Sequence, residues 1–446
     1  MSNKHLHLHL KERRRMKLKT LTTAMILATV PMTGAFAAAL DRSGQSISAF
    51  LQPGNYFEAG ISVLDPNVSG KVRNGYTPHA ALPASSAGLQ NTSVGEMAGD
   101  YYFPSAALKL QVTDNFSFGL IYDQPFGAEA EYSTGTQKTT ALPGPLAPLG
   151  NQGAFHNGTE GTSAEVKSQS ISMLFGYQPT ENFNFYAGPV YQTTEGDVQL
   201  RGLAYGGSAT FGGYNASIKE TGDIGWLAGA AFQIPDIALK ASVTYRSEIE
   251  HSVNVKESFN SAGLLAGLNA APSLNTDITT PQSVNLDFQT GIMANTVAFA
   301  NVRWVDWSSF SIQPYKFGLA SKSAAIQAQT GKSEFDLVAY TDDQISATVG
   351  VGRKLNDQWA GNVSVGWDSG AGNPVTTLGP TEGYWNVGLG AQFSPTPQTF
   401  IAGGVKYFWL GDAKAQAASQ FDTPNYVAEF EDNNAIAYGL KLGYRF

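Results

Sequence analysis

Few residues of this 446-residue chain have the types and spacing that catalysis requires. Beyond residue 37 the histidines are His79, His156 and His251, which lie in or near turn-rich segments, where we expect them to be solvated. None stands at a spacing that recruits a Ser or a carboxylate as a catalytic partner. The sequence has no cysteine and no His or carboxylate cluster with the spacing of metal ligands. We therefore expect no enzyme, no metal site and no cofactor.

The polar groups that could act on a ligand are basic side chains that alternate with apolar ones. In extended strands this parity places six of them on the inward side, together with acids such as Asp123, Asp287 and Asp368. The six are Lys109, Lys240, Arg246, Arg303, Lys406 and Lys441. Most should form structural pairs, and an unmatched cation among them would suit a carboxylate head group.

The strands that would position these residues are clearest at the C-terminus. In residues 435–446 (AIAYGLKLGYRF), every second residue from Ile436 to Phe446 is apolar or aromatic, and the others are small or basic. One face suits lipid and the other a polar interior, which is typical of the closing strand of a bacterial outer-membrane barrel. Taken alone, the pattern also fits the edge of a soluble β-sandwich.

The N-terminus predicts export. A basic stretch, an apolar run over residues 21–33 and the small-residue pattern Ala35-Phe36-Ala37 form a signal peptide, residues 1–37, whose initiator is either Met1 or Met16. The formal net charge is −8, which disfavours nucleic acid as a partner. After the signal no apolar run has the length of a membrane-spanning helix, so a helical membrane protein is excluded.

Period-two apolar spacing recurs along the rest of the chain. Six short polar turns alternate with long connections (about residues 65–100, 123–162, 248–281 and 306–334), which is the asymmetry of a transmembrane barrel. The fold class is therefore all-β, with a 14-stranded antiparallel barrel over residues 56–446 and a short hatch-like plug segment over residues 38–55. The predicted strands are residues 56–64, 102–112, 116–122, 169–177, 183–191, 224–233, 238–246, 284–290, 297–305, 344–353, 359–368, 384–393, 400–409 and 435–446.

Two segments of the long connections carry no charge, residues 141–150 (ALPGPLAPLG) and residues 261–274 (SAGLLAGLNAAPSL). Their apolar side chains are costly to leave in water. They either pack on each other as a loop cap or form a landing site for an apolar ligand. The side chains are Leu142, Leu146, Leu149 and the nearby Phe155 in the first, with Leu264, Leu265 and Leu268 in the second.

Several pieces of the chain, in their order and spacing, resemble the FadL-type outer-membrane transporters of long-chain fatty acids and related hydrocarbons. The pieces are residues 63–71 (VLDPNVSGK), 116–127 (FSFGLIYDQPFG), 245–248 (YRSE), 304–310 (WVDWSSF), 355–368 (LNDQWAGNVSVGWD) and the final strand.

This resemblance implies a barrel blocked by an N-terminal hatch, with sideways release of the ligand through a kinked third strand. Gly119, Pro125 and Gly127 are then the gate residues, although a plain strand ending at Pro125 is equally allowed. The resemblance also implies a pocket arginine at Arg201. Where the family's hatch carries Asn-Pro-Ala, this chain has Gln52-Pro53-Gly54. The neighbouring Phe50 and Leu51 either reach the pocket or pack inside the barrel wall.

We therefore expect passive uptake of hydrophobic small molecules, such as long-chain fatty acids, across the outer membrane. The expected partners are outer-membrane lipid, lipopolysaccharide and, through the strand ending in Phe446, the barrel-assembly machinery. The alternative from another class is a general diffusion porin for small hydrophilic solutes. An outer-membrane hydrolase would need a Ser or His pair that the sequence does not supply.

Overall fold

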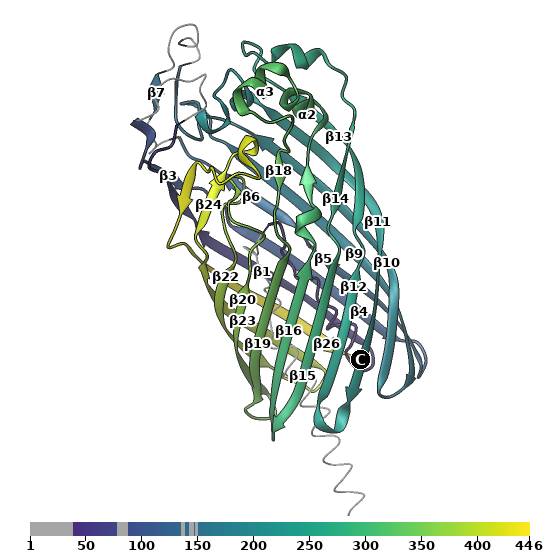
Figure 1. Cartoon of the computed structure of the whole chain (residues 1–446). Coiled ribbons are helices and arrows are strands. Elements are labelled where there is room, and N and C mark those ends of the chain that lie inside the picture. The colour runs from purple at the N-terminus through teal and green to yellow at the C-terminus, as the bar shows by residue number, and fades with distance from the viewer. Residues whose placement is uncertain (1–38, 78–87, 135–138, 142–146, 148–149) are drawn as a thin grey trace, which may run out of the picture.

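The computed structural model describes residues 39–77, 88–134, 139–141, 147 and 150–446. Its strands form one closed, antiparallel, 14-stranded barrel, which confirms the predicted fold class (Figure 1). The last strand pairs with the first in an unbroken register from Tyr56↔Arg445 to Asn67↔Asn434, so the sheet has no open edge there. The predicted signal peptide, residues 1–37, lies outside the described residues.

All fourteen predicted strands are present. In chain order they are β1 (Tyr56–Asn67), β4 (Tyr101–Gln111), β5 (Phe116–Asp123), β9 (Ser163–Thr180), β10 (Phe183–Gln199), β11 (Asn215–Ile234), β12 (Leu239–Arg246), β15 (Ser283–Met293), β16 (Thr296–Val305), β19 (Gln344–Lys354), β20 (Trp359–Asp368), β22 (Tyr384–Phe393), β23 (Thr399–Leu410) and β26 (Asn434–Arg445).

Three strands are longer than their apolar pattern predicts. β9 begins six residues earlier than expected, β10 runs on to Gln199, and β11 already begins at Asn215. Their outer halves carry charged outward residues such as Lys167 and Glu195 in place of apolar ones. Because this part of the wall stands above the lipid, the alternation that marks a half-buried strand is lost there.

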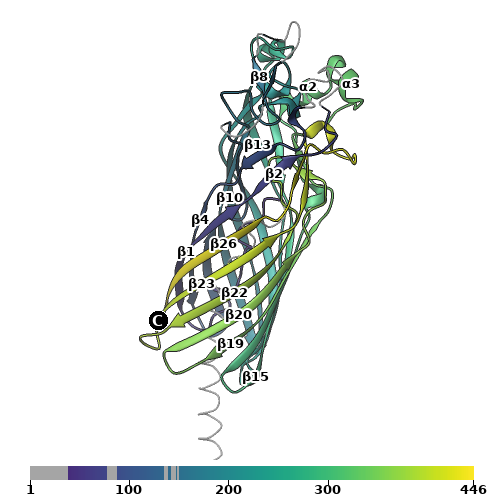
Figure 2. The same cartoon turned by 90° about the vertical axis from the view of Figure 1, so that its left-hand side faces the viewer.

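Further elements cover the outer end, which is the upper end in Figures 1 and 2. One five-stranded sheet consists of β2 (Ser69–Val72), β3 (Ser93–Glu96), β21 (Val375–Thr376), β24 (Ala413–Gln416) and β25 (Ala428–Phe430). The remaining elements at this end are β6 (Gly127–Glu131), β7 (Thr140–Ala141), β8 (Asn151–Gln152), β13 (Ile249–Ser258), β14 (Asn275–Thr280), β17 (Ser311–Ile312), β18 (Val338–Ala339), α2 (Tyr315–Ser321), α3 (Ala324–Thr330) and the short 3₁₀ turns η3 (Leu203–Tyr205), η4 (Phe211–Gly213), η6 (Ala266–Ala270), η7 (Trp307–Ser309) and η8 (Ala418–Gln420). The 3₁₀ turn η5 (Pro235–Ile237) joins β11 to β12 at the opposite, inner end.

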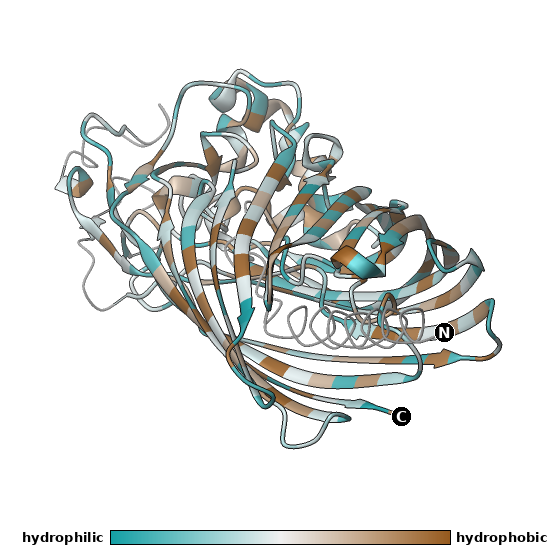
Figure 3. Cartoon of the chain, turned by 90° about the horizontal axis from the view of Figure 1, so that it is seen from below, coloured by the Kyte–Doolittle hydropathy of each residue, from teal (hydrophilic) through white to brown (hydrophobic). Residues whose placement is uncertain are grey.

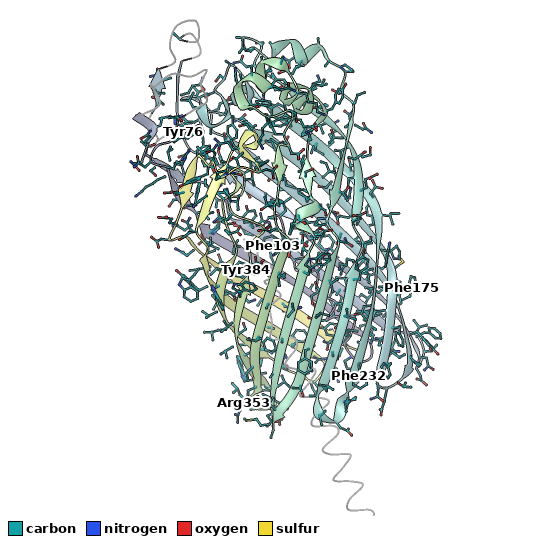
Figure 4. The ribbon with its side chains drawn as sticks, viewed as in Figure 1. Tyr76, Phe103, Phe175, Phe232, Arg353 and Tyr384 are labelled. Atoms are coloured by element: carbon teal, nitrogen blue, oxygen red, sulfur yellow. The ribbon has the colours of Figure 1, made fainter. Side chains whose placement is uncertain are left out.

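The two faces of the wall divide as predicted. On β26 the outward side chains from Ile436 to Phe446 are all exposed, whereas the inward Lys441 is buried. Figure 3 shows the resulting alternation of apolar and polar residues along the strands, and Figure 4 shows Phe175 and Phe232 low on the wall. No helix in the described part of the chain is both long and apolar enough to cross a membrane.

The interior has two apolar clusters. The larger one fills the space beneath the outer loops and includes Trp307, Phe317 and Phe155. The smaller one lies deeper in the barrel around Phe50 and Tyr56. Between them, residues 39–55 lie against inward-facing side chains of the wall, so the lumen contains a piece of the chain itself.

Candidate ligand path through the barrel wall

The third strand is broken. β5 ends at Asp123 and β6 begins at Gly127, and both pair with β9. The ladder between β4 and β5 stops at Ala106, although β4 continues to pair with β1 as far as Tyr101. Pro125 lies in the break, where it has no N–H to give to a ladder. The outer end of β4 therefore has no partner from the third strand.

The N-terminal segment fills part of this break. The backbone N–H of Arg42 donates to the Pro125 carbonyl at 2.7 Å, and that of Gly127 donates to the Leu40 carbonyl at 2.8 Å. Asp41 thereby forms an antiparallel bridge with Phe126. The Phe126 ring turns inward and packs edge-on against Trp307, with 5.5 Å between the ring centroids. The break is thus held by backbone pairing on one side and aromatic packing on the other.

Inward cations of the wall hold this segment in place. Arg303 binds both carboxylate oxygens of Asp41, donating from Nε to Oδ2 at 2.8 Å and from Nη2 to Oδ1 at 3.0 Å. Lys240 donates to the Leu51 carbonyl at 2.8 Å, and Lys109 donates to the Gln52 carbonyl at 2.5 Å. Arg246 reaches the Gln45 carbonyl at 3.3 Å. These predicted inward residues are therefore structural, as expected for most of them.

Phe50 packs inside the barrel wall. Its ring occupies the space left by two glycines on neighbouring strands, because a Cβ on Gly119 would lie 2.4 Å from the ring and one on Gly176 would lie 2.8 Å from it. The ring also meets Tyr186 edge-on at 5.8 Å. Leu51 packs against the same cluster. Of the two alternatives for these residues, the structure has packing in the wall, and neither lines a cavity described below.

A cavity opens at the break and is called the lateral cavity here. It encloses about 810 Å³ of empty space, including its mouth. Its walls are residues 103–107 of β4, residues 121–124 at the end of β5, and Arg42, Ser43, Ser46 and Ser48 of the N-terminal segment. Apolar wall residues and hydroxyl groups therefore share it, and Phe103 marks its place on β4 in Figure 4.

A second cavity lies toward the loops and is called the outer cavity here. It has about 930 Å³ of empty space, including its mouth. Its lining is almost wholly apolar and small, from Ala128, Ala164 and Val166 to Ile312, Leu337 and Leu378. Among the described residues that line it, only Arg42 and Glu129 carry a charge. A space of this size with so few polar groups suits an apolar ligand.

Arg201, the predicted pocket arginine, lies on the loop side of the barrel. The Arg201 side chain is buried and donates to the Glu160 carboxylate at 2.8 Å, to the Leu200 and Tyr214 carbonyls, and to Asn215. It lines neither cavity. Its contacts hold the end of β10 to the start of β11, which gives Arg201 a structural role.

The apolar loop residues that the structure describes have different surroundings. Phe155 is fully buried and stacks on Tyr132 at 4.3 Å. Leu265 is buried, Leu268 packs against the outer cluster, and Leu264 is exposed. Leu142, Leu146 and Leu149 lie outside the described residues.

The histidines correct one expectation. His156 and His251 are fully buried and not solvated. The Nδ1 of His156 accepts the Gly158 N–H at 3.1 Å, and burial lowers the pKa of this imidazole. Local turn composition does not reveal that the outer loops fold over these side chains.

One acidic group outside the membrane region is strongly perturbed. Glu382, in the loop before β22, has its pKa raised to about 8, first by burial and further by the nearby Asp368 and Asp342. The Gly372 N–H donates to its Oε1 at 3.3 Å and opposes this rise. The group lines neither cavity, so it bears on loop stability rather than on the ligand path.

Comparison with known proteins identifies the family. Residues 150–446, more than half of the chain, match the family model described as "Outer membrane protein transport protein (OMPP1/FadL/TodX)". The chain belongs to the FadL/TodX family. This FadL/TodX-family member is therefore an outer-membrane transport protein, as its barrel and the sequence resemblance predicted. Among curated proteins, none matches the sequence significantly.

Solved structures share the fold of this FadL/TodX-family chain at low sequence identity. A Pseudomonas aeruginosa FadL homologue is 15% identical, with a TM-score of 0.63 over 96% of this chain and 98% of that one. The Pseudomonas putida toluene transporter TodX is 12% identical, with a TM-score of 0.55 over 96% and 98%. The CymD monoaromatic hydrocarbon channel is 11% identical, with a TM-score of 0.50 over 94% and 97%.

Proposed function

We propose that this FadL/TodX-family protein takes up hydrophobic small molecules passively, long-chain fatty acids among them, and releases them sideways into the membrane. The observation that carries the proposal is the lateral cavity, which lies where the β4–β5 ladder stops and the third strand breaks at Pro125. The outer cavity would receive the ligand first. No chemical reaction is part of this proposal.

A sideways exit is favoured because a ligand that left through the inner end of the barrel would enter water. Moving apolar surface from water to lipid stabilises it by about 25 cal/mol per Å², so a long acyl chain leaves more easily through the wall than downward into water. The downward route also contains the N-terminal segment, whose backbone is held by Lys109 and Lys240. This occupied lumen counts against the general porin, which needs an open polar channel.

The lipid-facing wall supports two further parts of the proposal. The exposed aromatic residues of β26, which end in the stacked pair Tyr444 and Phe446, suit contact with outer-membrane lipid at the interface. The charged outer halves of β9 and β10 suit contact with lipopolysaccharide. The same C-terminal strand would be the one that the barrel-assembly machinery handles.

Filling the lateral cavity tests the proposed exit. Ala107 is buried, lines the lateral cavity and belongs to β4. Ala107→Trp should slow the uptake of oleate into cells or vesicles while leaving the folded, heat-modifiable barrel intact. The matched control is Ala391→Trp on the lipid-facing side of β22, which should transport like the unchanged protein. Equal uptake by both variants would refute lateral release.

The substrate class needs its own measurement. Growth of a deletion strain on oleate, compared with growth on aromatic hydrocarbons, should show a defect on one of them that the intact gene restores. A planar-bilayer recording separates the porin alternative, because large, stable, ohmic current steps would contradict a barrel whose lumen is occupied.

A further inference from the structure

Arg42 stands between the two cavities. In the described part of the chain it is the one residue that lines both the outer and the lateral cavity. Its side chain is 8% exposed, so it is part of the interior rather than of the surface. Arg42 therefore stands on the boundary that the two cavities share.

The backbone of Arg42 is fixed, whereas the side chain is held by contacts that can exchange. The residue before it, Asp41, is bound by Arg303, and the residue after it, Ser43, donates to Asp123 at 2.7 Å. The Arg42 guanidinium lies 4.0 Å over the Tyr101 ring, and its Nε donates to the Gly127 carbonyl at 2.5 Å. A guanidinium on an aromatic face is attracted by the ring quadrupole, and this attraction is stronger where the pair is shielded from water, as Arg42 is.

The charges around Arg42 do not favour an anionic ligand. Glu129 lines the outer cavity beside it, and Tyr101 bonds to the Glu129 backbone through its hydroxyl. Asp123 lines the lateral cavity, as does Glu58, whose carboxylate is already paired with Lys441 at 3.0 Å. A carboxylate that approached Arg42 would meet these acids on both sides, and like charges repel more strongly where water is scarce.

We propose that the Arg42 side chain is the partition between the outer and lateral cavities, and that apolar ligands cross when it swings off Tyr101, neutral ones faster than carboxylates. This inference rests on the proposed uptake function. It assigns to Arg42 a gating and selecting role in which the guanidinium blocks the path at rest and does not serve as the anchor of a carboxylate.

Matched probes distinguish a partition from an anchor. Purified full-length protein in vesicles is assayed for uptake of oleyl alcohol and of oleate, which share a chain and differ in the head group, with empty vesicles subtracted. Arg42→Ala should raise the rate for oleyl alcohol by on the order of 30-fold, the factor that corresponds to losing one cation–aromatic contact shielded from water. Arg42→Lys keeps the positive charge but lacks the planar guanidinium. Its rate for oleyl alcohol should lie between that of the unaltered protein and that of Arg42→Ala.

Two further variants keep the test decisive. Arg353→Ala removes an exposed arginine at the inner end of β19, which Figure 4 shows well below Phe103, and Arg353 lines neither cavity, so both rates should stay unchanged. Tyr101→Ala removes the ring on which Arg42 rests and should also raise the oleyl alcohol rate, which covers the case that Arg42→Ala does not fold.

The possible results distinguish a failure of the proposed Arg42 partition from a failure of the proposed uptake function. Slower oleate uptake by Arg42→Ala, with an unchanged oleyl alcohol rate, would make Arg42 an anchor and overturn the partition. Unchanged rates for both probes would overturn it as well, while leaving the uptake function intact. If the unaltered protein carries neither probe, the proposed function fails and this inference fails with it.

Discussion

The Asp41→Ala variant should release the N-terminal segment from the wall. Asp41 is 3% exposed and Arg303 is 1% exposed, so their ion pair is among the most deeply buried contacts of the described chain. It joins residues far apart in the sequence and fixes the start of the segment beside the break in the third strand. Removing the carboxylate leaves a buried guanidinium without its counter-ion.

The free-energy cost of Asp41→Ala depends on the hydrogen-bond acceptors that remain around Arg303. Breaking a buried ion pair by removing one partner costs about 3–5 kcal/mol. Arg303 retains the Asn285 Oδ1 at 2.8 Å, the Gln45 Oε1 at 3.0 Å and the Ser283 hydroxyl at 3.2 Å. These acceptors place the loss at the lower end, about 3 kcal/mol, which raises the population of the released segment on the order of 100-fold.

Two assays report this release. Trypsin should cut Asp41→Ala after Arg42 far faster than it cuts the unaltered protein, because the buried bond becomes accessible, and planar bilayers should show new open-channel events. The control is Asp357→Ala, which breaks the exposed pair with Lys354 and should change neither result. If Asp41→Ala resists trypsin and stays silent in bilayers like the unaltered protein, the segment is not held by this ion pair and the reasoning fails.

Three other changes have expected outcomes. Phe126→Ala removes the packing on Trp307, so hydrogen exchange of the backbone around the break should quicken and oleate uptake should change; unaltered exchange would contradict the anchoring role. Arg201→Ala should make the outer loops easier to cleave while leaving oleate affinity as it was, and a loss of affinity with intact loops would restore Arg201 to the ligand site. Because the pKa of Glu382 is raised when folded, the folded loop takes up a proton and its stability should fall as pH rises from about 4.5 to about 8. Glu382→Gln should abolish that slope, as measured by loop hydrogen exchange at both ends of this pH range, and a slope that persists would assign it to another group.

The sequence predicts the barrel well because the pattern that marks a strand is local. Lipid on one side and a polar interior on the other force a period of two, so β22 and β26 are visible as alternating residues. The six short turns are predictable for the same reason, because the residues that favour a turn act within a few positions of the chain. Where the wall leaves the lipid, as in the outer halves of β9 to β11, this constraint ends and the predicted bounds are too short.

The ligand path is much harder to predict because it depends on contacts between distant segments. Pro125 and Gly127 are recognisable as a possible break, but nothing local says that Leu40 and Arg42 fill it. Arg42 itself precedes the first strand, so strand parity gives it no orientation. Arg201 shows the converse, because a lone basic residue at a matching place is held by its own neighbours once the loops fold.

The most direct test of the account is to ask where a fatty acid touches the wall as it leaves. Oleate carrying a photoactivated diazirine near its tail, bound to the purified protein and irradiated, should label residues 103–107 of β4 and residues 121–124 at the end of β5, which line the lateral cavity. Labelling confined to the inner end of the lumen, with none at the broken third strand, would contradict release through the wall.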